Sequence, residues 1–240
     1  MGTASNLSRY KRILIKLSGE SLAVNGQSGL SADVVDKLAH QLKKVQALPT
    51  QISIVIGGGN IWRGVFGENM DRVTSDYMGM LATMINALAL QNALESIGVP
   101  TRVQSAINMQ KLAEPFIRRR AIRHLEKGRI VIFACGTGNP FFTTDTAAVL
   151  RASEVEAEVI LKATKVDGVY SDDPVKNKDA KRYTDLSFQE ALVENLRIMD
   201  ATAFSLCREK NIPVIVFDMT KNNNIVDVVC GKNVGTLIHN

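Results

Sequence analysis

The stretch VIFACGTGNPFFTTDTAAV, residues 131–149, predicts a strand, a glycine-rich turn and a helix start in direct succession. Residues 129–134 form the apolar strand, residues 135–142 the turn, and residues 143–150 open the helix. In a parallel α/β sheet such a loop lies beyond the carboxyl ends of the strands, where small ligands bind. A helix start also offers free N–H groups to an anion. Alone, the loop fits an anion site or an ordinary connection equally well.

A second loop of this kind follows the predicted strand at residues 12–17, which reads RILIKL and continues into Ser18 and Gly19. Lys16 interrupts the apolar residues at the carboxyl end of the strand. A buried lysine is costly without a partner, so Lys16 either reaches the surface along its aliphatic stem or meets an anion. The sequence leaves both open.

The third loop follows the predicted strand at residues 51–56 and begins with three successive glycines at residues 57–59. Glycines let a backbone approach a ligand closely, and successive N–H groups form an anion-binding nest. Arg63 could add a fork of donors for phosphate oxygens. A solvated arginine beside a flexible turn is the alternative. Because three such loops occur, we favour a phosphate site.

The remaining pattern alternates strands with helices, which predicts an α/β fold with a mostly parallel sheet covered on both faces. Ser187 and Glu190 form a capping box. The other expected elements are helices from Ser31, at residues 71–97, at the basic run Arg118–Arg120 and from Asp200 to Lys210, and strands near residues 101–104, 158–164, 213–217 and 235–238.

The composition narrows the class of protein. The chain has 240 residues, 45% of them apolar, enough for a sizeable core. The net charge of +5 suits anionic partners, although small phosphates meet this as well as nucleic acid does. The separated cysteines predict neither a disulfide framework nor a zinc site. We expect no signal peptide and no membrane-spanning segment, and we interpret residues 1–8 as a flexible tail. A cytoplasmic location is consistent with these features and with reduced cysteines.

Several phosphate-binding motifs are absent from the sequence. It contains no GxxxxGK[ST] motif, and the glycines at residues 136 and 138 lack the third glycine of GxGxxG. The HRD and DFG motifs of protein kinases are also missing. A phosphate site here must therefore belong to another class.

The sequence resembles the bacterial uridylate (UMP) kinases, which belong to the amino acid kinase fold family. The resemblance extends in order over residues 9–239. It rests on KLSGE at residues 16–20, GGGN-x-x-RG at 57–64, SDYMGMLAT at 75–83, GTGNPFFTTDTAA at 136–148 and LKATKVDGVYSDDP at 161–174.

The resemblance implies a three-layer αβα sandwich in one domain over residues 9–240, with an acceptor lobe at about 9–155 and an ATP lobe at about 156–240. It implies that ATP and UMP give UDP and ADP with Mg²⁺, in a hexamer inhibited by UTP. No resident protein metal site is expected. Control by GTP is left open, because the loop at residues 24–29 departs from the common pattern.

The resemblance also assigns residues to the ligands. The catalytic residues would be Lys16, Arg63 and Asp145, with Asp145 orienting a lysine or a metal-bound water. Roles for Lys162 and Asp200 stay open. The UMP site would comprise Gly58, Asp76, Thr137, Gly138, Asn139, Pro140, Phe141, Phe142, Thr143 and Thr144. The ATP site would comprise Lys16, Leu17, Ser18, Gly19, Gly59, Arg63, Thr164, Tyr170 and Asp173.

The chemistry of phosphoryl transfer to a nucleotide agrees with these assignments. A nucleoside monophosphate has a second pKa of about 6, so its oxygen is already anionic at neutral pH and needs no general base. Catalysis then depends on aligning two anions and offsetting their repulsion. Lys16 and Arg63 are the cations expected to do so.

Three rival functions remain at this stage. A kinase of the same fold could act on another phosphate or carboxylate, and a nucleotide sensor could have kept the fold without turnover. The intact Lys16, Arg63 and Asp145 argue against the sensor. A nucleic-acid-binding module would rest only on the net charge and the Arg118–Arg120 cluster, and we interpret that cluster as a solvated helix face.

The helix expected at residues 71–97 is apolar on two sides. Because one sheet cannot cover both sides, we expect the second side to pack against another copy of the chain. A helix buried within one large domain is the alternative. One side carries Met78, Leu81, Met84, Ile85 and Leu88; the opposite side, expected at the contact, carries Met80, Ala87, Leu90, Leu94 and Ile97.

Overall fold

The computed structural model describes residues 8–63, 70–174, 176–196 and 198–240. Two features of the sequence analysis lie outside this part: the tail at residues 1–8, except for Ser8, and Gly64, which ends the second motif.

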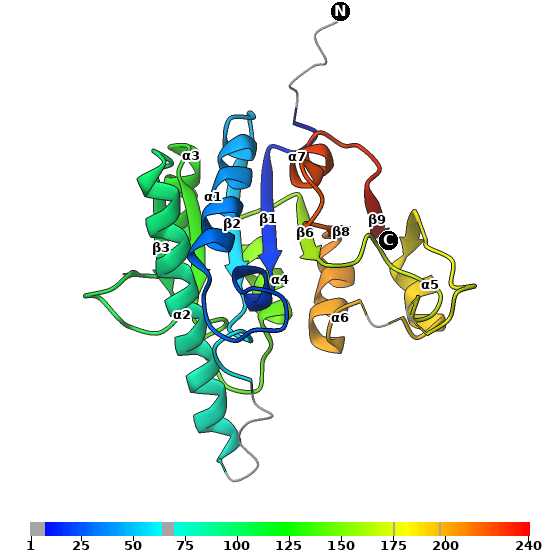
Figure 1. The fold of residues 1–240 in the computed structure, drawn as a ribbon, viewed down its shortest axis with the longest axis horizontal. Helices are drawn as coiled ribbons and strands as arrows, with labels where there is room; N and C mark the ends of the chain where they lie inside the picture. The colour runs from blue at the N-terminus through cyan, green and yellow to red at the C-terminus, as the bar shows by residue number, and fades with distance from the viewer. Residues whose placement is uncertain (1–7, 64–69, 175, 197) are drawn as a thin grey trace, which may run out of the picture.

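One sheet forms the middle of the molecule (Figure 1). Its order is β4-β3-β5-β2-β1-β6-β8-β9-β7, and all neighbours are parallel except β8 and β9. The strands are β1 (Arg12–Leu17), β2 (Gln51–Ile56), β3 (Thr101–Ser105), β4 (Glu114–Pro115), β5 (Ile130–Ala134), β6 (Val159–Thr164), β7 (Asp185–Ser187), β8 (Val214–Asp218) and β9 (Gly235–His239).

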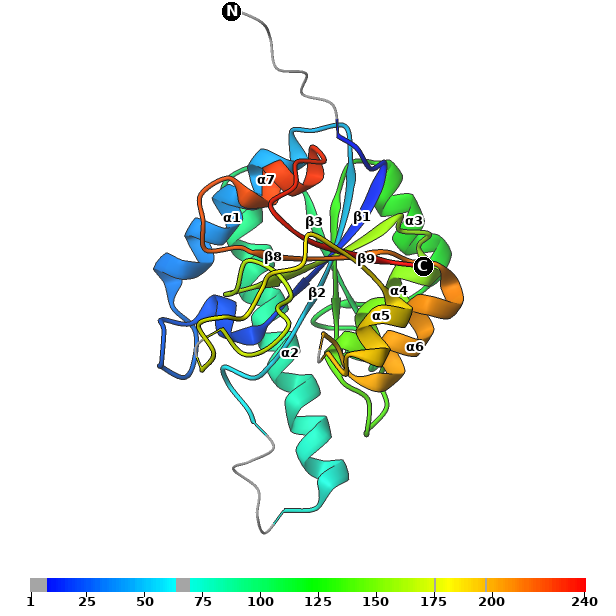
Figure 2. The same cartoon turned by 90° about the vertical axis from the view of Figure 1, so that its right-hand side faces the viewer.

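Helices cover both faces of this sheet, as Figure 2 shows. On one side lie α1 (Ala32–Gln46), α2 (Arg72–Ser96) and α7 (Asn224–Val229); on the other lie α3 (Arg118–Glu126), α4 (Thr144–Glu154), α5 (Phe188–Val193) and α6 (Ala201–Lys210). Residues of β1 alternate between the two cores: Ile13 and Ile15 face the first and Leu14 the second, all fully buried. The predicted α/β class with three layers is confirmed.

The local signals at helix starts are mostly confirmed. Ser187 and Glu190 form the capping box of α5, and the Asp200 carboxylate caps α6 by accepting from the N–H of Ala203. Ser31 occupies the N-cap position of α1, but its side chain makes no capping hydrogen bond. The short elements β4, β7 and α7 were not predicted.

The expected contact face of α2 was wrong. Met80, Ala87, Leu90 and Leu94 are buried in the core of their own chain. The exposed side instead carries Tyr77, Leu81 and Ile85, which are 44%, 48% and 48% exposed. Because both sides are apolar, the 3.6-residue period identified two stripes without showing which one the sheet covers.

Two arginines of the basic helix α3 have intramolecular partners. The Arg118 guanidinium pairs with Glu156 and donates to the carbonyl of Glu154, and Arg123 pairs with Glu126 at 3.6 Å. These contacts agree with a solvated helix face. Among the described residues, no helix is both long and apolar enough to cross a membrane.

Candidate active site

Four adjacent parallel strands bring the predicted loops to one edge of the sheet. The order β5-β2-β1-β6 is continuous, so the loops that follow these strands meet at their carboxyl ends. Residues far apart in the sequence therefore surround one site.

A buried charge cluster lies at the centre of this edge. Lys16 of β1 and Lys162 of β6 are register partners on neighbouring strands. The carboxylate of Asp145, in the first turn of α4, lies between them: its Oδ1 is 2.7 Å from the Lys16 Nζ, and its Oδ2 is 2.7 Å from the Lys162 Nζ. Lys162 also donates to the carbonyl of Ile198 at 2.6 Å. Lys162 is thus part of the site and not a surface lysine.

The environment shifts the pKa of two members of this cluster. Burial favours the neutral form of Asp145, but the ammonium groups of Lys16 and Lys162 outweigh it and hold the pKa of Asp145 below its ordinary value. Burial lowers the pKa of Lys162, and Asp145 offsets only part of this effect. At neutral pH the carboxylate is charged, so the cluster contains one anion between two lysine side chains.

Helix starts hold Asp145 in place. Thr143 caps α4, because its hydroxyl accepts from the N–H of Asp145 at 3.1 Å and from the N–H of Thr146 at 3.3 Å. The same hydroxyl donates to the Asp200 carboxylate, and the Thr146 hydroxyl donates to it at 3.1 Å. Asp200 therefore ties the start of α6 to the start of α4.

The glycine turn after β2 packs against α2 without room for a side chain. A Cβ at Gly58 would lie 2.7 Å from the carbonyl oxygen of Gly79 and 2.8 Å from the Cβ of Ala82. Such distances are too short for any other residue type. Arg63 follows the turn; its Nε donates to the carbonyl of Gly59 at 3.2 Å, and its guanidinium pairs with Glu20. The Arg63 side chain is 54% exposed at the rim of the site.

A cavity of about 450 Å³ adjoins this turn. Predicted UMP residues meet in its wall: Gly58, Asp76, Thr137, Asn139, Phe142, Thr143 and Thr144. Gly138, Pro140 and Phe141 are not among the lining residues, although the N–H of Phe141 donates to the Asp76 carboxylate at 2.7 Å. Sequence reasoning missed Trp62, Ser75, Gly79, Met80, Thr83 and Gly136.

A second cavity, of about 300 Å³, adjoins the other side of the charge cluster. Lys162, Thr164 and Tyr170 line it, and the Tyr170 hydroxyl donates to Asp167 at 2.7 Å. Asp172 lines this cavity, whereas Asp173, which was predicted, does not. Because Lys162 lines the second cavity and Thr144 lines the first, Asp145 and its lysines lie between the two. Leu17 ends β1 next to Lys16, and Ser18 and Gly19 follow the strand; the Ser18 hydroxyl accepts from the N–H of Glu20.

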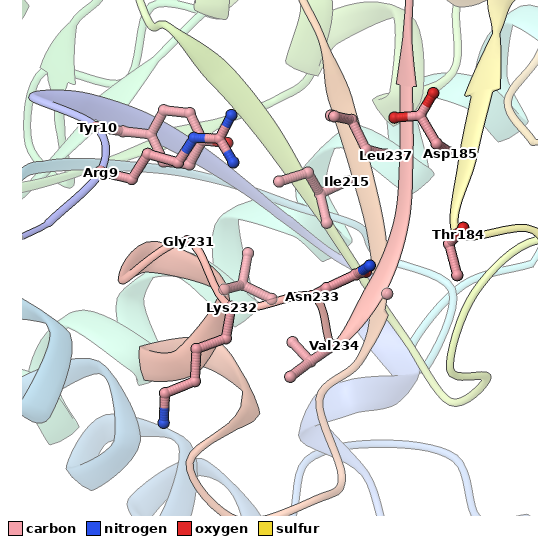
Figure 3. Close-up of a pocket in the computed structure, with 12 residues that line it drawn as sticks. Arg9, Tyr10, Thr184, Asp185, Ile215, Gly231, Lys232, Asn233, Val234 and Leu237 are labelled. Carbon is pink, nitrogen blue, oxygen red and sulfur yellow. The ribbon is translucent and has the colours of Figure 1, made fainter.

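A smaller hollow, of about 180 Å³, lies elsewhere (Figure 3). Arg9 and Tyr10, which line it, precede β1, whereas Lys16 and Ser18 lie at the opposite end of that strand. The Arg9 guanidinium stacks 5.5 Å above the Tyr10 ring. This hollow is therefore separate from the candidate site.

Within the described part of the chain, no three His, Cys, Asp or Glu side chains come together as a metal site. The Asp145 carboxylate is already engaged by two lysines. Magnesium usually keeps several waters and binds through substrate phosphates with one or two carboxylates. The donor set therefore fits a metal that arrives with a nucleotide better than a resident ion.

The amino acid kinase family model matches residues 11–218, and the chain belongs to this family. Two similar solved structures are bacterial. A UMP kinase from Bacillus anthracis is 41% identical, with 96% of each chain covered and a TM-score of 0.94. A UMP kinase from Ureaplasma parvum is 45% identical, with 97% of this chain and 100% of the other covered and a TM-score of 0.92.

Proposed function

We propose that this protein is a UMP kinase that transfers the γ-phosphoryl group of ATP directly to UMP, giving UDP and ADP in pyrimidine nucleotide synthesis. The observation that carries the proposal is the Lys16–Asp145–Lys162 cluster between two cavities at one sheet edge. The solved UMP kinases that share 41–45% identity with the chain support the choice of acceptor.

In this proposal the first cavity holds UMP and the second holds the nucleoside of ATP. Lys16 and Lys162 stabilise the charge on the transferred group, while Asp145 orients both lysines and takes no proton. Arg63 moves from Glu20 to a phosphate oxygen when a nucleotide binds. Magnesium accompanies ATP and neutralises part of its phosphate charge.

In this proposal the two lobes are consecutive parts of the chain, and ATP contacts residues of both. Residues up to about 155 supply the acceptor lobe, and residues from about 156 supply the ATP lobe. Gly59, Leu17, Ser18 and Gly19 face the ATP phosphates, and Thr164, Tyr170 and Asp173 hold the nucleoside. Asp76 binds the ribose of UMP, and the loop at residues 137–144 reads its base and phosphate.

We further propose that the protein assembles through the exposed side of α2 in a cytoplasmic hexamer inhibited by UTP. Tyr77, Leu81 and Ile85 form an apolar stripe on this side. Leaving such side chains in water forgoes roughly 1.5–3 kcal/mol each, and a two-fold contact would cover two copies of the stripe at once.

A coupled ADP-release assay across UMP, CMP, dTMP and AMP tests the function. We expect a strong preference for UMP, because the site would hydrogen-bond the uracil edge and the ribose hydroxyls. A nucleotide that lacks one of these groups would leave its buried partner in the site unpaired. Comparable efficiency with CMP or dTMP would reject this acceptor. Binding of UMP and ATP without ADP formation would instead favour a sensor.

A further inference from the structure

Two asparagines form a buried pair beneath the glycine turn. Asn86 lies in the middle of α2 and is fully buried, and Asn60 closes the turn and is 4% exposed. The Asn86 Nδ2 donates to the Asn60 Oδ1 at 2.7 Å, and the Asn60 Nδ2 donates back to the Asn86 Oδ1 at 3.1 Å. A polar group is costly to bury unless it is hydrogen-bonded, so a satisfied pair specifies one arrangement of its surroundings.

The pair also binds the backbone of two loops. The Asn86 Nδ2 donates to the carbonyl of Gly57 at 2.7 Å. This contact fixes the orientation of the Asn86 amide, because a flipped amide would place two oxygens together. Asn60 holds Gly29 twice: its Nδ2 donates to the Gly29 carbonyl at 2.8 Å, and its own carbonyl accepts from the Gly29 N–H at 2.6 Å. The loop after β1 and the turn after β2 are thereby tied to α2.

These contacts determine which backbone groups of the turn are free. The Gly58 carbonyl accepts from the N–H groups of Ile61 and Trp62, both at 3.0 Å, and the Gly57 carbonyl is held by Asn86. In the described part of the chain, the N–H groups of Gly58 and Gly59 have no hydrogen-bond partner. A turn with its carbonyls tied back and successive N–H groups free is suited to an anion.

We propose that Asn86 is a positioning residue for phosphoryl transfer, which holds the Gly57 carbonyl and Asn60 so that the N–H groups of Gly58 and Gly59 face phosphate oxygens. This inference rests on the proposed function. Asn86 touches no substrate; it acts through the turn. Without its Nδ2, the Gly57 carbonyl loses its donor and the turn is free to rotate an oxygen toward the phosphates.

The test compares Asn86→Leu with Asn60→Ala and with the control Gln91→Leu. Gln91 lies on the same helix and also donates its amide to a backbone carbonyl, that of Thr101 at 3.3 Å, at the start of β3 and away from the glycine turn. For each variant we would measure kcat, the KM for UMP, thermal unfolding and the calorimetric affinity for inorganic pyrophosphate.

We expect Asn86→Leu to lower kcat by about 10- to 100-fold, as small misplacements of catalytic groups do, and to weaken pyrophosphate binding. Asn60→Ala keeps the contact with Gly57 and should lower kcat only by about two- to tenfold. Gln91→Leu should match the wild type in kcat and in pyrophosphate affinity at temperatures where it is folded.

Two results would overturn the proposal: a kcat and pyrophosphate affinity for folded Asn86→Leu equal to those of Gln91→Leu, or losses that only follow the unfolded fraction. If Asn86→Leu does not fold, unchanged kcat and affinity in Asn60→Ala would overturn it. A wild type that binds pyrophosphate but makes no UDP would reject the proposed function, and the pyrophosphate comparison would still decide the role of Asn86.

Discussion

Replacing Asp145 by asparagine should destabilise the protein strongly at neutral pH. The carboxylate lies 2.7 Å from each of two ammonium groups, and the side chains of Lys16, Asp145 and Lys162 are only 12%, 14% and 15% exposed. Removing the anion leaves two buried lysines without their nearest counter-charge. Breaking a buried ion pair in this way costs about 3–5 kcal/mol, which we expect as the loss in free energy of unfolding at pH 7.

The pH dependence of this loss follows from the lowered pKa of Asp145 in the folded protein. A carboxylate whose pKa is lower in the folded than in the unfolded protein stabilises the fold. This stabilisation is fully present above the ordinary pKa of 3.8 and is lost as the pH falls through the pKa of the folded protein. The difference between wild type and Asp145→Asn should therefore shrink as the pH falls below that value. Urea unfolding, followed by circular dichroism at several pH values, measures it.

A second substitution separates electrostatics from packing. In the Asp145→Asn background, Lys162→Met should restore stability because it removes an unpaired buried cation, whereas in the wild type it should lower stability. Asp36→Asn is the control, since Asp36 is exposed and pairs with His40 at the surface; its loss should stay within about 1 kcal/mol. A loss below about 1 kcal/mol in Asp145→Asn would refute the reasoning.

Three further predictions concern turnover, assembly and pH. Lys16→Met and Arg63→Ala should each lower kcat by about two to four orders of magnitude in a folded protein; near-normal turnover would remove that residue from charge stabilisation. Leu81→Glu should dissociate the oligomer in light scattering, whereas Leu90→Glu, in the core, should unfold the chain; a wild-type monomer would contradict the interface. The contact with Asp185 raises the pKa of His239 above 6.5. The protonated imidazole should therefore stabilise the fold fully below pH 6.5, and this contribution should disappear as the pH rises through the raised pKa. In urea unfolding at several pH values, His239→Gln should abolish this dependence.

Local pattern predicted the central strands and the capped helices well, because β1, β2, β5 and β6 are mostly apolar runs, and a glycine follows each of the first three within two residues. It could not predict β4 or β7, which have two and three residues. Elements this short form only where another strand pairs with them, β3 for β4 and β9 for β7. Their sequences are too short to show the alternation of apolar and polar residues by which a strand is predicted.

The arrangement of the candidate site could also be predicted only in part from the sequence. The loops were predicted because each begins at a strand end, but the pairing of Lys16 with Lys162 depends on β1 and β6 being neighbours in the sheet. Sequence order does not reveal that. Asn86 could have been predicted as a structural residue, because an amide side chain within the apolar helix α2 needs a hydrogen-bond partner when it is buried.

The most direct measurement of the central claim is the product formed from UMP and Mg-ATP, separated by chromatography during the first turnovers. Direct transfer predicts UDP and ADP in equal amounts, UDP formation that requires UMP, and its near-complete loss in Lys16→Met. ADP without UDP, or UMP binding without either product, would contradict the assignment of this protein as a UMP kinase.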